Sequence, residues 1–197
     1  MEYTPENLIK DGRFRLLYEG ESDGVRADIS SRLQKYIDEC PYKDDKNYGH
    51  LCNLLTVMAV YEALQNKGLS KEEAIGEIKN AMYTAVEPMR IANVEEAKKE
   101  GYIEKIKAEH KQEMYETYGL GWDFEFPKCD EDEFTYLIKT CIYNETFKRY
   151  SYPELGPLFC HVDEILNGDL EKIDFTYTGQ LCVNAKPCDY RFRYKER

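Results

Sequence analysis

The chain has 197 residues, of which 42% are hydrophobic, and this is enough for one domain with a buried core. Its formal net charge of -11 argues against a nucleic-acid partner and against an anionic membrane surface, because both need clustered Lys and Arg. No apolar run reaches membrane-spanning length and the opening stretch MEYTPENLIKDGRFR has no apolar signal core, so the seven cysteines are expected to be reduced thiols in a cytoplasmic protein.

The first part of the chain is weakly patterned. Residues 1–23 are polar and poorly periodic, and within them Arg13–Tyr18 is predicted to be a short strand or a loop. Residues 25–39 are predicted to be a helix, since their apolar residues recur on one side. Pro41 is expected to end that helix.

Three longer helices are predicted next. The strongest spans His50–Asn66, where the apolar stripe has helical spacing and Gly68 follows as a stop. Residues 70–73, Ser-Lys-Glu-Glu, form a capping box, so another helix is expected to begin there and to break or kink at Pro88. The third long helix is predicted over 93–118.

The periodicity then changes from 3.6 to 2. Aromatic residues alternate with acidic ones over 122–126, and residues 133–143 alternate again, with a β-branched and aromatic content that favours a strand over a helix. A turn is predicted between them, and its acidic run 130–133 is interpreted as solvated. Residues 153–168 predict a helix, and residues 173–181 and 188–194 predict a hairpin.

This order of elements predicts an α+β fold. We expect N-terminal helices packed on a C-terminal antiparallel sheet of about four strands, with a helix crossing the sheet. The whole of residues 1–197 is predicted to be one domain, with a mainly helical half over 25–118 and a sheet-containing half over 119–197. The sequence leaves the oligomeric state open.

The helix over 153–168 has an unusual second face. Besides its apolar stripe it carries Gly156, Cys160, Asp163 and Asn167 at helical spacing. A solvated face would carry Lys and Glu, whereas this face is small and holds one carboxylate. The strand over 188–194 places Cys188 on its apolar face, with Arg191 on the other. The thiols and the carboxylate are therefore expected to converge.

These motifs resemble the L-2-amino-thiazoline-4-carboxylic acid hydrolase family over roughly residues 45–195. The resemblance lies in a C-x-x-D helix, a strand ending in Thr-Gly, and a C-D-[FY]-R-F strand; the matching residues are Cys160, Asp163, Thr178, Gly179 and Cys188–Phe192, with Cys141 upstream. The loop 183–186 lacks the glycine usual in the family. The resemblance implies a small-molecule substrate and hydrolytic opening of a 2-aminothiazoline ring to an N-carbamoyl amino acid.

Two uses of the cluster remain open. Cys141, Cys160, Asp163 and Cys188 offer the thiolates and carboxylate that zinc accepts in a tetrahedral set, and the family's distant similarity to vinyl-reductase-type small-ligand-binding domains, some of which hold zinc in this way, points to the same use. Alternatively, a thiolate attacks the amidine-like carbon of the ring, with Asp163 as general base or as a holder of the ring nitrogens.

Other polar residues are weighed against structural roles. His50 and Asn53, one helical turn apart, are either core residues or a pocket wall that binds a ligand carboxylate. His110 is interpreted as core and His161 as surface. Four cysteines are interpreted as incidental: Cys40, Cys52, Cys129 and Cys182. The alternatives to a hydrolase are a small-ligand-binding or sensor domain without catalysis and, third, a subunit whose sheet edge serves a partner.

Overall fold

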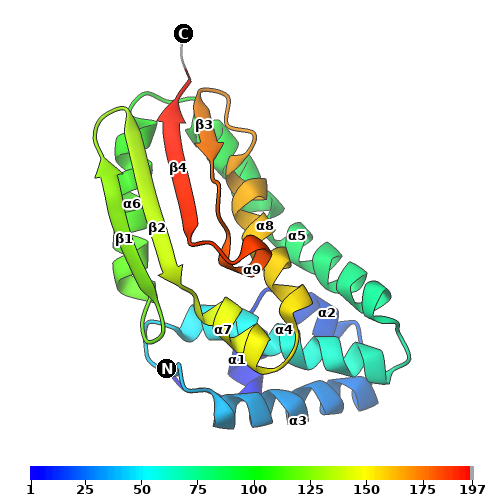
Figure 1. The fold of residues 1–197 in the computed structure, drawn as a ribbon. Helices are drawn as coiled ribbons and strands as arrows, with labels where there is room; N and C mark the ends of the chain where they lie inside the picture. The colour runs from blue at the N-terminus through cyan, green and yellow to red at the C-terminus, as the bar shows by residue number, and fades with distance from the viewer. Residues whose placement is uncertain (196–197) are drawn as a thin grey trace. The chain divides into compact units, whose positions relative to one another are not determined.

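The computed structural model describes residues 1–195 and divides into two compact units, Met1–Ala85 and Val86–Arg197 (Figure 1). The first unit contains α1 (Pro5–Asp11), α2 (Arg15–Glu19), α3 (Asp23–Glu39), α4 (Tyr48–Asn66) and the first part of α5 (Lys71–Glu96). The second contains the rest of α5, α6 (Tyr102–Thr117), β1 (Asp123–Cys129), β2 (Glu133–Thr140), α7 (Ile142–Arg149), the short 3-10 turn η1 (Pro153–Leu155), α8 (Gly156–Asn167), β3 (Ile173–Thr176), α9 (Leu181–Asn184) and β4 (Cys188–Tyr194).

The N-terminal stretch is helical, so the prediction of a short strand or loop over Arg13–Tyr18 was wrong. Thr4 caps α1 by accepting a hydrogen bond from the Asn7 N–H at 3.2 Å, and α2 follows after one short turn. Helices of this length show too few periods for their pattern to stand out in a sequence. The predicted helices over 25–39 and 50–66 are confirmed as α3 and α4.

The capping box at the start of α5 is confirmed. The Ser70 N–H donates to the Glu73 carboxylate at 2.8 Å, and the Glu73 N–H donates to the Ser70 hydroxyl at 3.2 Å. The break predicted at Pro88 is not seen, because α5 continues past it to Glu96. Proline removes its own backbone donor and its ring crowds the carbonyl group four residues earlier, and α5 continues despite both effects. The next helix begins only at Tyr102, after Gly101 takes a left-handed φ of 72°.

The second unit is built on a four-stranded antiparallel sheet with strand order β1-β2-β4-β3, and the α+β class is thereby confirmed. Strand β2 ends earlier than predicted: its ladder reaches Thr140, and α7 begins at Ile142. The apolar residues Tyr143 and Phe147 lie four positions apart, which suits a helix. The strand predicted over 133–143 is therefore confirmed only for the residues of β2, up to Thr140. The strand predicted to run to Leu181 is likewise short, because α9 occupies Leu181–Asn184.

One face of this sheet is apolar and covered by helices. In β2 and β4 the pairs Phe134–Phe192 and Tyr136–Tyr190 lie side by side in register. Helix α6 packs on this face through His110, whose ring centroid lies 5.5 Å from that of Tyr136 and 5.7 Å from that of Phe192. This layer is the core that holds the C-terminal motifs in place.

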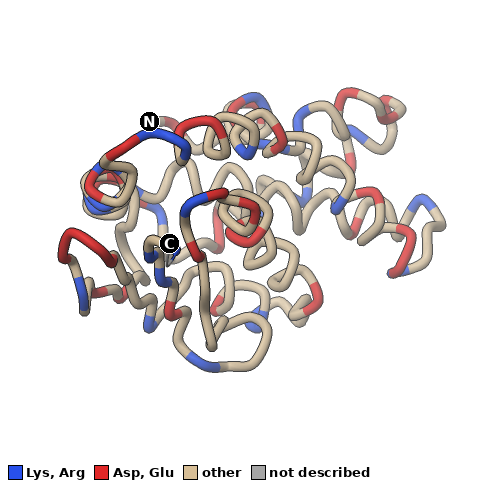
Figure 2. Tube along the Cα trace, turned by 90° about the horizontal axis from the view of Figure 1, so that it is seen from above, with Lys and Arg blue, Asp and Glu red and all other residues tan. Residues whose placement is uncertain are grey.

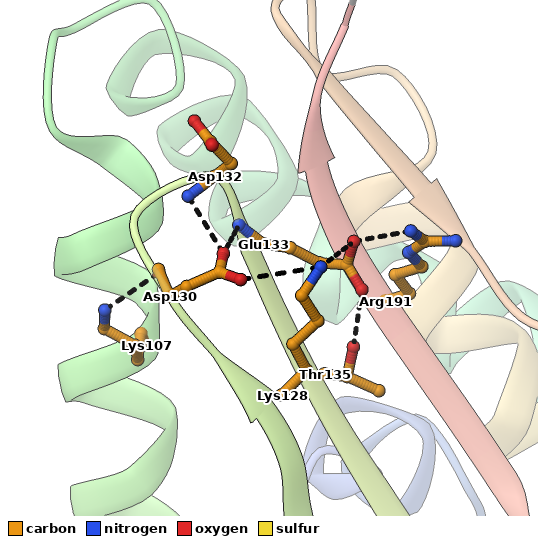
Figure 3. Close-up of polar contacts among 7 residues, drawn as sticks. All are labelled: Lys107, Lys128, Asp130, Asp132, Glu133, Thr135 and Arg191. Carbon is orange, nitrogen blue, oxygen red and sulfur yellow. Dashed lines mark hydrogen bonds and ion pairs between the residues drawn. The ribbon is translucent and has the colours of Figure 1, made fainter.

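The turn between β1 and β2 carries a network of charges (Figure 3). Asp130 accepts the backbone N–H groups of Asp132 and Glu133 at 3.1 and 2.8 Å. Glu133 is buried, and its carboxylate pairs with Lys128 at 3.1 Å and with Arg191 from β4. The acidic run interpreted as solvated therefore includes one buried, paired carboxylate that joins β2 to β4. Arg191 is engaged in that pair.

Charged residues are spread along the chain. Figure 2 shows basic positions interspersed with acidic ones along the described trace. The absence of a nucleic-acid partner stays a prediction from the net charge of -11. Within residues 1–195, no helix combines the length and the apolar character needed to cross a membrane.

Candidate functional site

Helix α8 is buried on both of the faces predicted from its sequence. Leu155, just before it, and Val162 belong to the apolar stripe, while Gly156, Cys160 and Asn167 of the second face are also buried. The second face is thus a packed surface and not a solvated one. It looks towards the residues that follow β3 and towards the apolar face of β4.

The thiols of Cys160 and Cys182 lie close enough to perturb one another. The side chain of Cys182 is the largest influence on Cys160, and it lowers the pKa of that thiol below its usual 9.0. Burial and the charge of Asp163 raise the pKa of Cys160, while the backbone of Cys182 adds to the lowering. The same interaction raises the pKa of Cys182, so Cys160 is the more readily ionised thiol of the two.

A glycine makes this approach possible. Gly156 lies one helical turn before Cys160, and a Cβ at this position would stand 2.7 Å from the Cβ of Cys182 and 2.9 Å from its sulfur. Any larger residue would push Cys182 away from α8. The small second face predicted from the sequence therefore has a defined role, which is to let a second thiol reach Cys160.

Asp189 fixes the segment that carries Cys182. Its carboxylate accepts the Thr178 N–H at 2.7 Å, the Thr178 hydroxyl at 2.5 Å and the Gly179 N–H at 2.6 Å. Partial burial opposes ionisation, but these donors prevail and lower the pKa of Asp189. A side chain at Gly179 would collide with the carbonyl oxygen of Pro187. The Thr-Gly and Cys-Asp motifs thus form one latch that positions α9.

The other two predicted thiols are neutral. Burial raises the pKa of Cys188 to about 12, and the charges of Cys160 and Asp163 also raise it. The Leu181 N–H donates to the sulfur of Cys188 at 3.4 Å and lowers this pKa. Burial, with the charges of Cys188 and Cys160, also raises the pKa of Cys141. These effects place Cys188 within electrostatic range of Cys160 and Asp163, and Cys141 within range of Cys188 and Cys160.

Asp163 lies among tyrosine hydroxyls. The Tyr190 hydroxyl donates to its carboxylate at 2.9 Å, and burial together with the charge of Asp163 raises the pKa of Tyr190, Tyr136 and Tyr118. These phenols therefore stay protonated and can donate hydrogen bonds. Gln180 joins the two elements, since its amide lies 3.3 Å from the Cys160 carbonyl oxygen and 3.5 Å from the Tyr190 hydroxyl.

A depression of about 400 Å³ opens beside the sulfur pair. Its wall contains Gly156 and Cys182, so Cys182 faces the depression while Cys160 lies behind it and is buried. The remaining lining comes from α7, Pro153 and the α9 segment, in full Asn144, Phe147, Lys148, Pro153, Leu181, Val183, Asn184 and Ala185. The volume suits a small molecule.

His50 and Asn53 belong to the first unit. Loss of solvation, with the nearby Arg13 charge, lowers the pKa of His50 to about 4. The Asn53 side chain accepts the Arg13 N–H at 2.9 Å and donates to the Gly49 carbonyl oxygen at 3.0 Å. These contacts tie α4 to the turn after α1, so Asn53 has a structural role in its own unit.

The zinc prediction finds no geometric counterpart. Among residues 1–195, no group of three or more His, Cys, Asp or Glu side chains is arranged so that it could hold a metal ion. The pair of Cys160 and Cys182 supplies two sulfurs, and Cys188 directs its sulfur at the Leu181 N–H. Zinc therefore stays a prediction from the sequence, and no chemical step below depends on it.

Sequence reasoning missed Cys182, Gln180 and Tyr190. Cys182 was interpreted as incidental, yet it is the direct partner of Cys160. One available signal was that Gly156 lies one helical turn before Cys160 on α8, because a glycine there leaves room for another side chain beside Cys160. Another was that Cys182 lies between the Thr-Gly and Cys-Asp motifs, because hydrogen bonds between these two motifs fix the position of the segment that contains Cys182.

The comparisons agree with the motifs. The family model described as L-2-amino-thiazoline-4-carboxylic acid hydrolase matches residues 50–192 of the 197. The search of curated proteins gave no match. The matched region contains the predicted C-x-x-D helix, the Thr-Gly turn and the Cys-Asp strand, as well as the thiol pair that they position. It covers well over half of the chain and supports a hydrolase-type function, and the chain therefore belongs to the L-2-amino-thiazoline-4-carboxylic acid hydrolase family.

Proposed function

We propose that this protein is a thiol-dependent hydrolase that opens a small cyclic amidine such as 2-aminothiazoline-4-carboxylate. The observation that carries the proposal is the asymmetry among the clustered thiols. The pKa of Cys160 is lowered by the thiol of Cys182, whereas burial raises the pKa of Cys141 and Cys188. A thiolate is the nucleophilic form of cysteine, so Cys160 is the nucleophile of the group.

The reaction proceeds in two balanced halves. The Cys160 thiolate adds to C2 of the ring, the C2–S bond of the ring breaks, and the ring sulfur leaves and takes up a proton. The product of this half is an isothiourea joined to Cys160 through sulfur. Water then adds to the same carbon, the bond to Cys160 breaks, and the N-carbamoyl amino acid is released with the thiolate restored.

Asp163 and the phenols have the supporting roles. The carboxylate of Asp163 holds the ring nitrogens in the first half and accepts a proton from the attacking water in the second. The Tyr190 hydroxyl, 2.9 Å from that carboxylate, fixes its orientation. Cys188 and Cys141 stay protonated, because their pKa values are raised. Cys182 favours ionisation of Cys160 through the interaction that lowers the pKa of Cys160.

The test is turnover by single-cysteine variants on a panel of 2-aminothiazolines and related rings. We expect Cys160→Ser to lose turnover by more than about a hundredfold, because a serine hydroxyl is a far weaker nucleophile at neutral pH. The matched control is Cys129→Ser, which changes a thiol on β1. Mass spectrometry of a quenched reaction should find the isothiourea adduct on the peptide containing Cys160. Full turnover by Cys160→Ser would refute the assignment.

A second candidate is binding without chemistry. The observation that favours it is the ring of protonated tyrosines around Asp163, which suits recognition of a cationic or amide-bearing ligand whether or not a bond is broken. A ligand that stabilises the protein against heat and is recovered unchanged after long incubation would favour this candidate over the hydrolase.

A further inference from the structure

The depression beside Cys182 has a one-sided charge. Of its lining residues, Lys148 is the charged one, and the lining contains no carboxylate. This is unusual for a chain with 38 acidic residues and a net charge of -11. The carboxylate of Glu145 hydrogen-bonds the lining residue Asn144 at 2.9 Å but is not itself part of the lining. A lining with one cation and no carboxylate favours an anionic ligand.

The ammonium group of Lys148 has no ion-pair or hydrogen-bond partner among the described residues. Other lysines of the same unit are engaged: Lys128 pairs with Glu133 at 3.1 Å and Lys139 with Glu125 at 2.5 Å. Lys148 is exposed, so its charge is available to a molecule that enters from solvent. A ligand would gain this interaction without first breaking an internal pair.

The backbone of Lys148 belongs to a helix that is anchored by a buried side chain. It lies in the last turn of α7, directly after Phe147, which is 1% exposed and lines the same depression. The opposite wall is the α9 segment, which the Asp189 latch holds at Thr178 and Gly179. Lys148 and Cys182 thus line the same small space, and Cys160 is buried.

We propose that Lys148 binds the carboxylate of the substrate and thereby orients the electrophilic carbon towards the thiol pair. This inference rests on the proposed hydrolase function for the identity of the ligand. The lysine acts as a point charge on a flexible stem and can follow a carboxylate through the depression. It is a binding residue that sets specificity, and it takes no part in the bond changes.

The first experiment measures binding, so that it does not depend on turnover. Calorimetry would compare L-2-aminothiazoline-4-carboxylate with 2-aminothiazoline, which lacks the carboxylate, on the wild type, Lys148→Gln and Lys148→Arg. We expect the glutamine variant to bind the carboxylate compound about tenfold more weakly, the arginine variant to recover most of the loss, and the compound without a carboxylate to bind all three proteins alike.

Arg149→Gln is the matched control, because it removes one exposed positive charge from the next position without altering the lining of the depression. It should bind the carboxylate compound as the wild type does. If the wild type binds both compounds equally, or if Lys148→Gln keeps the preference, the inference is overturned. Absence of turnover with a retained, Lys148-dependent preference would overturn the proposed hydrolysis and support the carboxylate site.

Discussion

Replacing Gly156 with alanine tests the central geometry of the site with one methyl group. The added Cβ would stand 2.7 Å from the Cβ of Cys182, where ordinary contact begins at 3.4 Å. Cys182 and the α9 segment must therefore move by at least about 0.7 Å, and overpacking of this kind typically costs about 1–3 kcal/mol. Because Asp189 latches that segment at Thr178 and Gly179, it cannot move freely.

Two measurements follow from this displacement. Urea denaturation should show a free energy of unfolding lower by about 1–3 kcal/mol. The reaction of Cys160 with iodoacetamide, followed by peptide mass mapping over a range of pH, should shift to higher pH. The reason is that Cys160 loses the interaction with Cys182 that lowers its pKa. Turnover should fall with the thiolate fraction at neutral pH.

The control is Gly76→Ala in α5, where an added Cβ meets nothing within 4 Å. That variant should be more stable by about 0.5–1 kcal/mol, since alanine is the better residue inside a helix. The reasoning would be refuted if Gly156→Ala were as stable as the wild type and its Cys160 reacted with an unchanged pH dependence.

Three further predictions concern the second unit. Asp189→Asn should lower the free energy of unfolding by about 1–3 kcal/mol at neutral pH, because it weakens charged hydrogen bonds. Since the pKa of Asp189 is lowered from 3.8, the difference in stability between variant and wild type should shrink as the pH falls below about 4. An unchanged difference in stability at low pH would contradict this prediction. Burial lowers the pKa of His110 from 6.5 to about 4, so wild-type stability should fall as pH drops from 6.5 towards 4, and His110→Phe should remove that part of the acid sensitivity in pH-dependent thermal melts. Glu133→Gln should destabilise by about 1–3 kcal/mol at pH 7, as read from urea melts, because Lys128 and Arg191 lose their shared anion; a neutral effect would show that the pair contributes nothing.

Long, strongly periodic segments were predictable from the sequence. Helices α3 and α4 and the start of α5 followed from the apolar stripes and the capping box, and the faces of β2 and β4 followed from alternation. The short elements α1, α2, α7 and α9 were not found. Each spans one or two helical turns, so its existence depends on tertiary contacts that a local pattern does not record.

The membership of the candidate site was only partly predictable from the sequence. The Cys160, Asp163 and Cys188 set followed from helical and strand faces, and the structure brings these residues within electrostatic range. Cys182 did not follow, because its position depends on a latch between Gly179 and Asp189 and on space above Gly156. Such packing relations join residues far apart in the chain, and no spacing rule describes them.

The layout of the sheet bears on how the second unit can meet another chain. Its edges are β1 and β3, and an open edge offers unpaired backbone groups to a passing strand. In β1 the register shifts between Glu125 and Lys128, around Pro127, which has no N–H to donate. Strand β3 is only four residues long. Both edges are thus poor templates for strand addition, which weighs against a partner that docks by extending the sheet and also protects the protein from edge-to-edge aggregation.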